Sequence, residues 1–227
     1  MNKNILAIFA VSALTLTACK KEATATESTV DTTATVMNDT VAVAGTTYNI
    51  AAADSKVEWE GGKVTGDKHL GTINIKEGNL VTDGGKLVDG KVVFDMASIV
   101  STDLADNPEM KAKLEGHLKG LTEEGKDDFF NTNTYPTATL DITRVYEENG
   151  KTMVEGNFDM KGKTDVVKFP VTVTETADAV TLVTDQFTID RTKWGVNYGS
   201  GTAIENLAAD QVIKDDIILK ASVTANK

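Results

Sequence analysis

The sequence predicts an all-β domain of antiparallel strands, with one or two short helices, behind an N-terminal region that does not join the fold. Three observations predict this fold class. From Tyr48 onward, short runs of alternating apolar and polar residues recur, and turn sequences rich in Gly and Asn separate them. Only one segment has the three- and four-residue apolar spacing of a helix. We expect one domain over residues 47–227, because about 180 residues suit one full core and leave little room for two.

Residues 1–18 have the pattern of a lipoprotein signal peptide. Lys3 gives a charged start, an apolar run extends from Ile5 to Leu16, and Thr17-Ala18 precede Cys19, the only cysteine of the chain. The run is shorter than the roughly 20 apolar residues that a spanning helix needs. We therefore predict that residues 1–18 are removed and that Cys19 is lipidated, which would anchor the protein to a membrane. An ordinary signal peptide or a short buried helix is the alternative.

Residues 19–46 are predicted to be a disordered tether. The stretch is rich in Thr, Ala and Val and has no aromatic residue, so it cannot bury enough apolar surface to offset the entropy lost on ordering. A domain on this tether would stand clear of a lipid surface. An edge strand from Thr40 to Thr47 is the alternative, since that segment has adequate β-propensity.

Charge and cysteine content exclude several classes of function. The net charge of the chain is −11, and about −10 of it falls in residues 47–227, a field that repels nucleic acid. No basic cluster offsets this field, so we exclude nucleic acid as a partner. With Cys19 lipidated, no thiol remains for a disulfide or a thiolate metal site.

Each predicted strand has one apolar and one polar face, as in a sheet that is wetted on one side. The apolar faces are Val57 and Trp59; Val88, Val92 and Phe94; Ala138, Leu140 and Ile142; Val154, Phe158 and Met160; Val167, Phe169, Val171 and Val173; Phe187 and Ile189; and Ile217, Leu219, Ala221 and Val223. Three turns, Asp83-Gly84-Gly85, Glu148-Asn149-Gly150 and Lys161-Gly162-Lys163, supply residues that suit tight hairpins. This pattern predicts a meander that closes into a barrel or folds as a sandwich.

One helix is predicted from Asn107 to about Gly120. Asn107-Pro108 is a helix-start signal, with Asn as the N-cap and Pro at the first helical position. An amphipathic helix in a β-domain must bury its apolar stripe against the sheet or across an open barrel end. A short second helix or a turn is expected from Glu123 to Phe130. The predicted stripe comprises Met110, Leu114, His117 and Leu121.

Six short motifs occur in order along the predicted domain. They are His69-Leu70-Gly71, Leu114-Glu115-Gly116-His117-Leu118-Lys119, Asp128-Phe129-Phe130-Asn131, Tyr135-Pro136-Thr137-Ala138, the run from Val154 to Thr164, and the run from Ile189 to Val196. As an ordered set from about Thr47 to Ala225, they resemble the YceI-like domain. The resemblance implies an extended, lipocalin-like antiparallel β-barrel whose interior accepts a long polyisoprenoid chain. It also implies an exported protein that binds its ligand without catalysis.

The apolar faces support this ligand class on physical grounds. About eight strands enclose an interior just wide enough for packed side chains or one slender ligand, and an apolar guest gains about 25 cal/mol per Å² of surface buried. The alternative is that these side chains fill a solid core. No cofactor, metal or catalytic residue is expected, and the ligand would be an isoprenoid or other lipid. The predicted ligand contacts are His69, Phe94, His117, Phe129, Phe130, Leu140, Phe158, Phe169, Phe187 and Trp194.

His69 and His117 are the only histidines, and two histidines without a free cysteine make a poor zinc site. We expect each to be largely buried and held by backbone or by an acid, or to bind the polar head of a ligand at the barrel mouth. Two other functions stay open. One is an enzyme acting on an apolar substrate with His69 or His117 as base, and the other is an adhesive or structural lipoprotein with a solid β-core.

Three further predictions concern the rim of the barrel, the role of Arg191 and the location of the protein in the cell envelope. The stretch from Leu121 to Lys126 is an insertion relative to the family pattern and should alter one rim of the barrel, and Phe158-Asp159 replaces a common Leu-Thr. Arg191 has the pattern of a buried ion pair with an unnamed partner. The residue after Cys19 is Lys20, whereas an Asp at this position would favour the inner membrane. We therefore expect a lipid anchor in the outer membrane, on its periplasmic face or at the cell surface. The sequence does not specify the oligomeric state.

Overall fold

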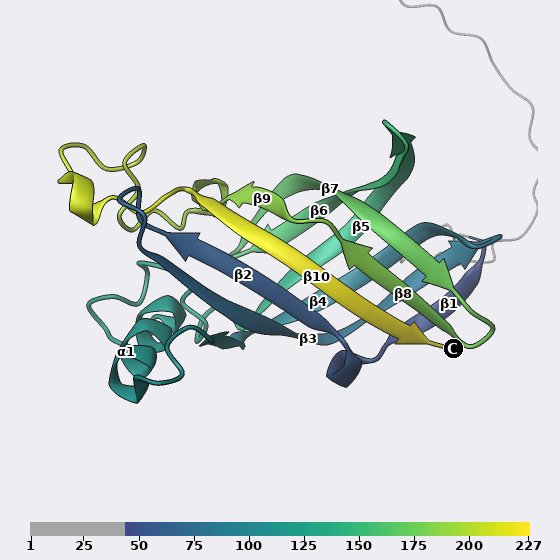
Figure 1. The fold of residues 1–227 in the computed structure, drawn as a ribbon, viewed down its shortest axis with the longest axis horizontal. Helices are drawn as coiled ribbons and strands as arrows, with labels where there is room; N and C mark the ends of the chain where they lie inside the picture. The colour runs from purple at the N-terminus through teal and green to yellow at the C-terminus, as the bar shows by residue number, and fades with distance from the viewer. Residues whose placement is uncertain (1–43) are drawn as a thin grey trace, which may run out of the picture. The chain divides into compact units, whose positions relative to one another are not determined.

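A computed structural model describes residues 44–227 (Figure 1). The predicted signal peptide, Cys19 and most of the predicted tether lie outside the described residues. The strands are β1 (Thr46–Ile50), β2 (Lys56–Gly62), β3 (Lys68–Asp83), β4 (Lys86–Ser101), β5 (Thr137–Glu148), β6 (Lys151–Met160), β7 (Lys163–Glu175), β8 (Ala179–Thr184), β9 (Phe187–Asp190) and β10 (Asp216–Asn226). The helices are α1 (Pro108–Lys119) and three short 3₁₀ helices, η1 (Ala52–Asp54), η2 (Arg191–Trp194) and η3 (Ala209–Gln211).

The strands form one antiparallel sheet that closes on itself. Strands β2 to β8 neighbour one another in chain order, and β10 completes the ring by pairing with β2 on one side and with β8 and β9 on the other. β1 shares a position with β2, because both lie between β3 and β10, and β9 shares a position with β8, because both pair with the same side of β10. The ten strands therefore fill eight positions around the barrel. The predicted all-β antiparallel barrel is confirmed, and closure, not sandwich packing, satisfies the strand edges.

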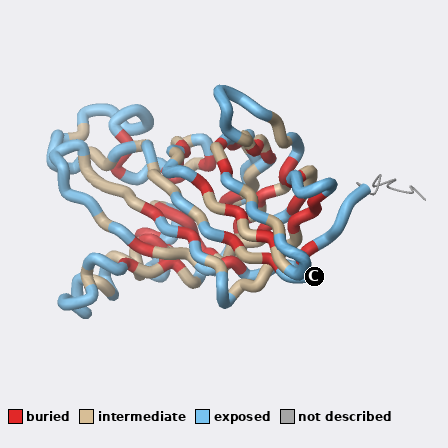
Figure 2. The backbone as a smooth tube through the Cα atoms, turned by 45° about the vertical axis from the view of Figure 1, so that its right-hand side comes forward, coloured by how far each residue is buried: buried red, intermediate tan, exposed pale blue. Residues whose placement is uncertain are grey.

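The inner faces of most strands are those that the alternation predicts. In β10 the four predicted residues, from Ile217 to Val223, line the barrel interior, and Figure 2 shows buried and exposed positions alternating along the strands. The prediction was wrong at Val88, which is half-buried while Leu87 is 3% exposed. A register shift between β3 and β4 at this point, opposite Val81 and Thr82, reverses the faces.

The three predicted hairpin turns are confirmed. Each joins its strands through two residues with positive φ: Gly84 and Gly85 (56° and 80°), Asn149 and Gly150 (52° and 75°), and Lys161 and Gly162 (53° and 71°). Two successive positive φ values are those of the type I′ turn, whose twist matches that of the flanking strands. These hairpins fix the register of the pairs β3–β4, β5–β6 and β6–β7.

Helix α1 begins and ends where the sequence predicts, but it buries a different stripe. The Asn107 side chain accepts a hydrogen bond from the Met110 N–H at 3.1 Å, and Gly120 ends the helix with a φ of 70°. Met110 and Leu121 are 48% and 56% exposed, whereas Leu118 is buried. Only the C-terminal half of α1 faces the barrel interior, so the predicted stripe is wrong at both ends. Turns occupy residues 123–128, and in residues 44–227 no helix has the length and hydrophobicity to cross a membrane.

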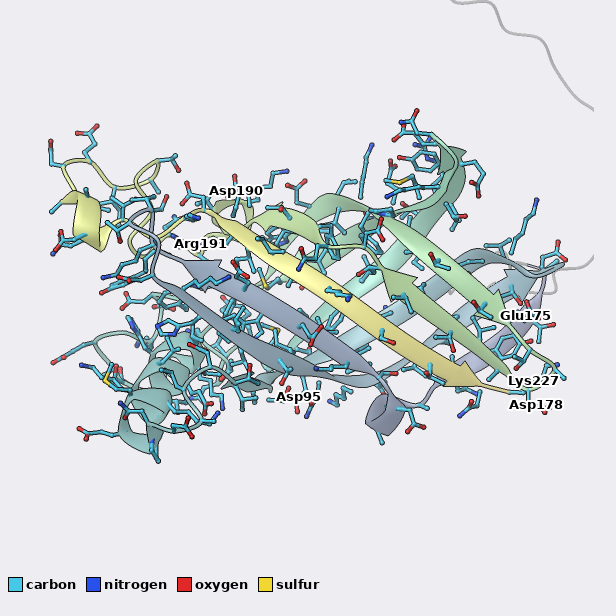
Figure 3. All side chains as sticks on the ribbon, viewed as in Figure 1. Asp95, Glu175, Asp178, Asp190, Arg191 and Lys227 are labelled. Atoms are coloured by element: carbon cyan, nitrogen blue, oxygen red, sulfur yellow. The ribbon has the colours of Figure 1, made fainter. Side chains whose placement is uncertain are left out.

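Arg191 lies at the corner where β9 ends and the connection to β10 begins, as Figure 3 shows. Its side chain is 2% exposed, and its guanidinium donates to the carbonyls of Lys214 (3.0 Å), Val196 (2.6 Å) and Ile213 (3.2 Å). Its ionic partner is Asp215, with 3.5 Å between Nη2 and Oδ1. Burial lowers the pKa of Arg191, and Asp215 and Asp190 oppose this shift. The predicted buried pair thus exists, and backbone carbonyls take most of its hydrogen bonds.

Candidate ligand-binding cavity

The interior of the barrel holds a cavity of about 350 Å³. Its wall consists almost entirely of apolar side chains from the inward faces of the strands, closed at one side by α1 and the turn that follows it. Side chains therefore do not fill the interior, and the solid-core alternative is wrong. Such a wall cannot satisfy polar groups of a guest, but it gains free energy by removing apolar surface from water.

Nine of the ten predicted contact residues lie on this cavity wall. The strands supply Phe94, Leu140, Phe158, Phe169 and Phe187, and the region around the opening supplies His69, His117, Phe129 and Phe130. The ring of Phe169 stacks on that of Phe187 at 4.6 Å between centroids, and Phe94 meets Phe158 edge to face at 5.9 Å. The structure thus brings these residues together around one space.

Trp194 lies behind the wall instead of on it. It is 1% exposed, its indole N–H donates to the carbonyl of Phe158 at 2.9 Å, and its ring meets that of Phe158 edge-on at 5.4 Å. Trp194 is carried by helix η2, and it contacts both the backbone and the side chain of Phe158. Its contribution is to hold a wall residue in place.

Most polar lining residues gather at one end of the barrel, which we call the mouth. Four connections form it: the β2–β3 turn (residues 63–67), the β4–β5 connection (102–136, containing α1), the β6–β7 turn (161–162) and the β9–β10 connection (191–215). Figure 1 shows α1 and the β9–β10 connection on opposite sides of this end, beyond the strands. The polar lining residues there are Lys63, Asp67, His69, His117, Arg191, Tyr198 and Lys214.

The opposite end of the barrel is held by Tyr48 from β1. Tyr48 is fully buried, and its hydroxyl donates to Oε1 of Glu175 at the end of β7, at 2.8 Å. The Lys227 ammonium lies 5.6 Å from the centre of the Tyr48 ring, within the range of a cation–π contact. Figure 3 shows Glu175, Asp178 and Lys227 grouped at this end, far from Arg191.

An aromatic cluster surrounds His117 at the mouth. The imidazole meets Phe129 edge to face at 5.0 Å and Tyr198 at 4.7 Å, and Phe129 and Tyr198 are 5.4 Å apart. Sequence reasoning missed Tyr198, because it lies outside every predicted strand and motif. The signal was available, since Tyr198 is the only aromatic residue in the long β9–β10 connection after η2.

Both histidines pair with a carboxylate, which is one of the roles the sequence predicts. His117 Nε2 lies 2.8 Å from Asp128 Oδ2, and His69 Nδ1 lies 2.8 Å from Asp103 Oδ2. Their side chains are 34% and 41% exposed, so neither is a buried core histidine. In residues 44–227, no group of three or more His, Cys, Asp or Glu side chains could hold a metal ion.

Asp103 is ionised throughout the physiological range. Burial opposes ionisation of its carboxyl, but hydrogen bonds from His69, the Leu70 N–H and the Ser101 hydroxyl outweigh burial and lower the pKa of Asp103 to about 2. The charged carboxylate holds the ring of His69 in one orientation, with Nε2 directed away from Asp103. The mouth therefore contains one imidazole that is fixed by a permanent negative charge.

Two strands absent from the sequence analysis complete the wall. β3 supplies Ile73 and Leu80, and β8 supplies Leu182. Alternation in β3 is broken between Ile75 and Glu77 by a register shift, which hides its apolar face. In β8 the alternation of Val180, Leu182 and Thr184 is regular and could have been found.

The fold and the cavity together define a lipocalin-like β-barrel with a hollow, apolar interior that opens at one end. Within that class, the chain belongs to the YceI-like domain family, whose sequence model matches residues 48–225. The six motifs that resemble this family all lie within the matched range. No curated protein matches the chain.

Two solved structures share the fold. The crystal structure of Burkholderia cenocepacia BcnA is 24% identical with a TM-score of 0.59, over 78% of this chain and 99% of BcnA. A polyisoprenoid-binding domain from Saccharophagus degradans, implicated in plant cell wall breakdown, is 18% identical with a TM-score of 0.55, over 79% of this chain and 97% of that domain. At these identities the likeness shows a common barrel.

Proposed function

We propose that this protein binds a polyisoprenoid or another long apolar lipid chain inside its barrel. The observation that carries the proposal is the cavity, about 350 Å³ with an almost wholly apolar wall. This volume lies within the usual range of ligand sites, about 300 to 1,000 Å³. A sugar or a nucleotide would leave its polar groups unpaired against such a wall. The polyisoprenoid class is supported by the YceI-like family and by the domain from Saccharophagus degradans, which binds polyisoprenoid.

The two histidines are proposed to bind the polar head of the ligand. Each has one ring nitrogen paired with a carboxylate, and within residues 44–227 the other ring nitrogen of each has no hydrogen-bonding partner. Both rings lie on the cavity wall at the mouth, where the head of a chain inserted tail first would stop. A hydroxyl or carbonyl head would satisfy one of these nitrogens.

The His117–Asp128 pair also has the geometry of a base oriented by an acid, which is the observation that would favour an enzyme. A covalent mechanism would need a nucleophile beside that base. Among the described residues, no Ser, Thr or Lys side chain hydrogen-bonds to His117. We propose binding as the role of the pair, on the support of the apolar cavity wall beside His117. Full turnover by a protein in which both His69 and His117 are Ala would exclude catalysis by either imidazole.

Protein purified from its native host is expected to carry about one long apolar chain per molecule, detected by solvent extraction and lipid mass spectrometry. Added polyisoprenoid at about 100 times its Kd should stabilise the fold by about 2.7 kcal/mol, which raises the Tm of a domain of this size by roughly 5 to 10 °C. A nucleotide at the same concentration serves as the control and should leave the Tm unchanged. Repeated preparations without a stoichiometric apolar ligand, together with an unchanged Tm, would contradict the proposal.

We further propose that Cys19 is lipidated and anchors the barrel in the cell envelope, at the outer membrane. The support is the sequence from Lys3 to Lys21, which lies outside the described residues. Replacing Cys19 with Ala is expected to remove the stable attachment and shift most of the protein from the membrane fraction to the soluble fraction, while leaving ligand binding intact. Fractionation of cells followed by mass spectrometry of the N-terminal peptide measures both. An unmodified Cys19 in the native protein would refute the anchor.

A further inference from the structure

Large hydrophobic side chains are exposed almost only at the mouth. Of the seven that are exposed within residues 44–227, six belong to the mouth connections or to a strand end beside them. The seventh, Val166, lies on the outer wall of β7 and faces away from the cavity. We call the six residues the apolar rim; they are Val64, Leu70, Met110, Leu121, Tyr198 and Ile204.

The rim is built from segments far apart in the sequence. Val64 lies in the β2–β3 turn and Leu70 near the start of β3, Met110 and Leu121 lie in and after α1, and Tyr198 and Ile204 lie in the β9–β10 connection. Single exposed hydrophobic residues are normal on a protein surface and need no explanation. Their gathering at one end, from three separate connections, indicates a surface that meets something apolar.

Apolar surface continues from the rim into the cavity. Tyr198 is 43% exposed and also lies on the cavity wall, where its ring contacts His117. The exposed residues Met110, in α1, and Leu121, just after it, flank the cavity-lining Leu114 and Leu118 in sequence. A ligand that leaves the cavity at the mouth therefore meets the rim before it meets bulk water.

The charge at the mouth indicates which kind of lipid surface the apolar rim would meet. The connections that form this end, residues 63–67, 102–136, 161–162 and 191–215, contain nine Lys or Arg and twelve Asp or Glu residues. This balance offers no electrostatic attraction to anionic lipid. It suits a zwitterionic lipid surface, which apolar side chains enter without help from charge.

The chain before the barrel is long enough to allow this orientation. The described chain begins beside β1, at the end opposite the mouth. From Cys19 to Ala44 the chain spans at most about 80 to 90 Å, at 3.3 to 3.6 Å per residue. The longest strands, β3 and β4, have 16 residues each, or about 50 Å at 3.3 Å per residue. An anchor at Cys19 therefore permits the far end of the barrel to face the same membrane.

We propose that the apolar rim docks on a zwitterionic lipid bilayer, so that an apolar chain passes between the bilayer and the cavity without crossing water. The evidence for docking is the set of exposed apolar residues at the rim. The passage of a ligand rests on the proposed function. The lipid surface is the committed partner. A second copy of the chain or a different protein on the rim is an outcome that the experiment separates.

Vesicle flotation of residues 20–227 tests the docking. This form lacks the lipidated cysteine and contains the whole closed barrel with its core (residues 46–226). It is expected to float with phosphatidylcholine or phosphatidylethanolamine vesicles, with no gain when phosphatidylglycerol is added. Changing Met110, Leu121 and Ile204 together to Ser should lower the partition coefficient about tenfold or more, because three side chains no longer transfer apolar surface from water to the bilayer. The matched control, Val166→Ser, should keep the partition coefficient of the parent.

The outcomes distinguish docking from ligand binding. The triple Ser variant should keep the Tm rise caused by detergent-solubilised polyisoprenoid, because its substitutions lie off the cavity wall. Equal flotation of parent and triple variant, or flotation only with phosphatidylglycerol, overturns the docking. The docking is also overturned if neither protein floats and light scattering detects a dimer of the parent but not of the triple variant. Flotation without any polyisoprenoid-dependent Tm rise overturns the proposed function and leaves the docking standing.

Discussion

Replacing Arg191 with Met is expected to lower the free energy of unfolding by about 3 to 5 kcal/mol, the usual cost of removing one partner of a buried ion pair. The methionine would leave three carbonyl oxygens, those of Val196, Ile213 and Lys214, without their donor. It would also leave Asp215, whose side chain is 18% exposed, without its cation. Both losses act at the corner that joins β9 to β10 and closes the ring. Urea unfolding followed by circular dichroism measures the change.

Arg144 provides the matched control, because it is the only other arginine of the chain. Its side chain is 56% exposed, and its partner Glu155 also pairs with Lys168 at 2.8 Å. Arg144→Met is expected to leave the urea midpoint nearly unchanged, since exposed ion pairs contribute little. Arg191→Lys keeps the positive charge but loses the planar set of guanidinium N–H donors, so its urea midpoint should lie between those of the parent and the Met variant. Equal midpoints for Arg191→Met and Arg144→Met would show that the corner does not depend on the guanidinium.

The regular parts of the barrel could be predicted because local rules and the final fold agree there. β10 alternates without interruption, and the turns at Gly84-Gly85 and Asn149-Gly150 contain residues that adopt positive φ at low cost. Where the ladder is irregular, the same rule fails. The register shift beside Val88 depends on how β3 and β4 pair, and pairing is a property of two segments that neither one specifies alone.

Closure and the site depend on contacts that spacing does not encode. A barrel and a sandwich give the same alternating faces, so only the pairing of β10 with β2 and β8 distinguishes them. The partner of His69 is Asp103, 34 residues further on. Helix α1 was placed correctly from its cap, but the face that it buries follows from where it crosses the barrel end, which exposes Met110.

Ligand binding should be weakened by a large side chain that fills part of the cavity from one wall residue. Val167 on β7 is 8% exposed and points into the cavity, whereas its neighbour Val166 is 45% exposed and points outward. The cross-strand partner of Val167 is Gly156 on β6, which has no side chain of its own and is covered by the side chain of Leu140. An indole at position 167 would therefore project into the cavity and occupy volume that an apolar chain needs.

Val167→Trp is expected to weaken polyisoprenoid binding by about tenfold or more, a loss of 1.4 kcal/mol or greater. The fold should survive, because overpacking typically costs about 1 to 3 kcal/mol and the cavity of about 350 Å³ can accept part of the ring. Val166→Trp introduces the same side chain one residue away, outside the barrel, and should bind like the parent. Titration of a fluorescent polyisoprenoid analogue, with the Tm of each apo protein measured in parallel, gives both quantities. If the two variants bind equally well with normal Tm values, the chain does not lie in the cavity, because only position 167 reaches that space.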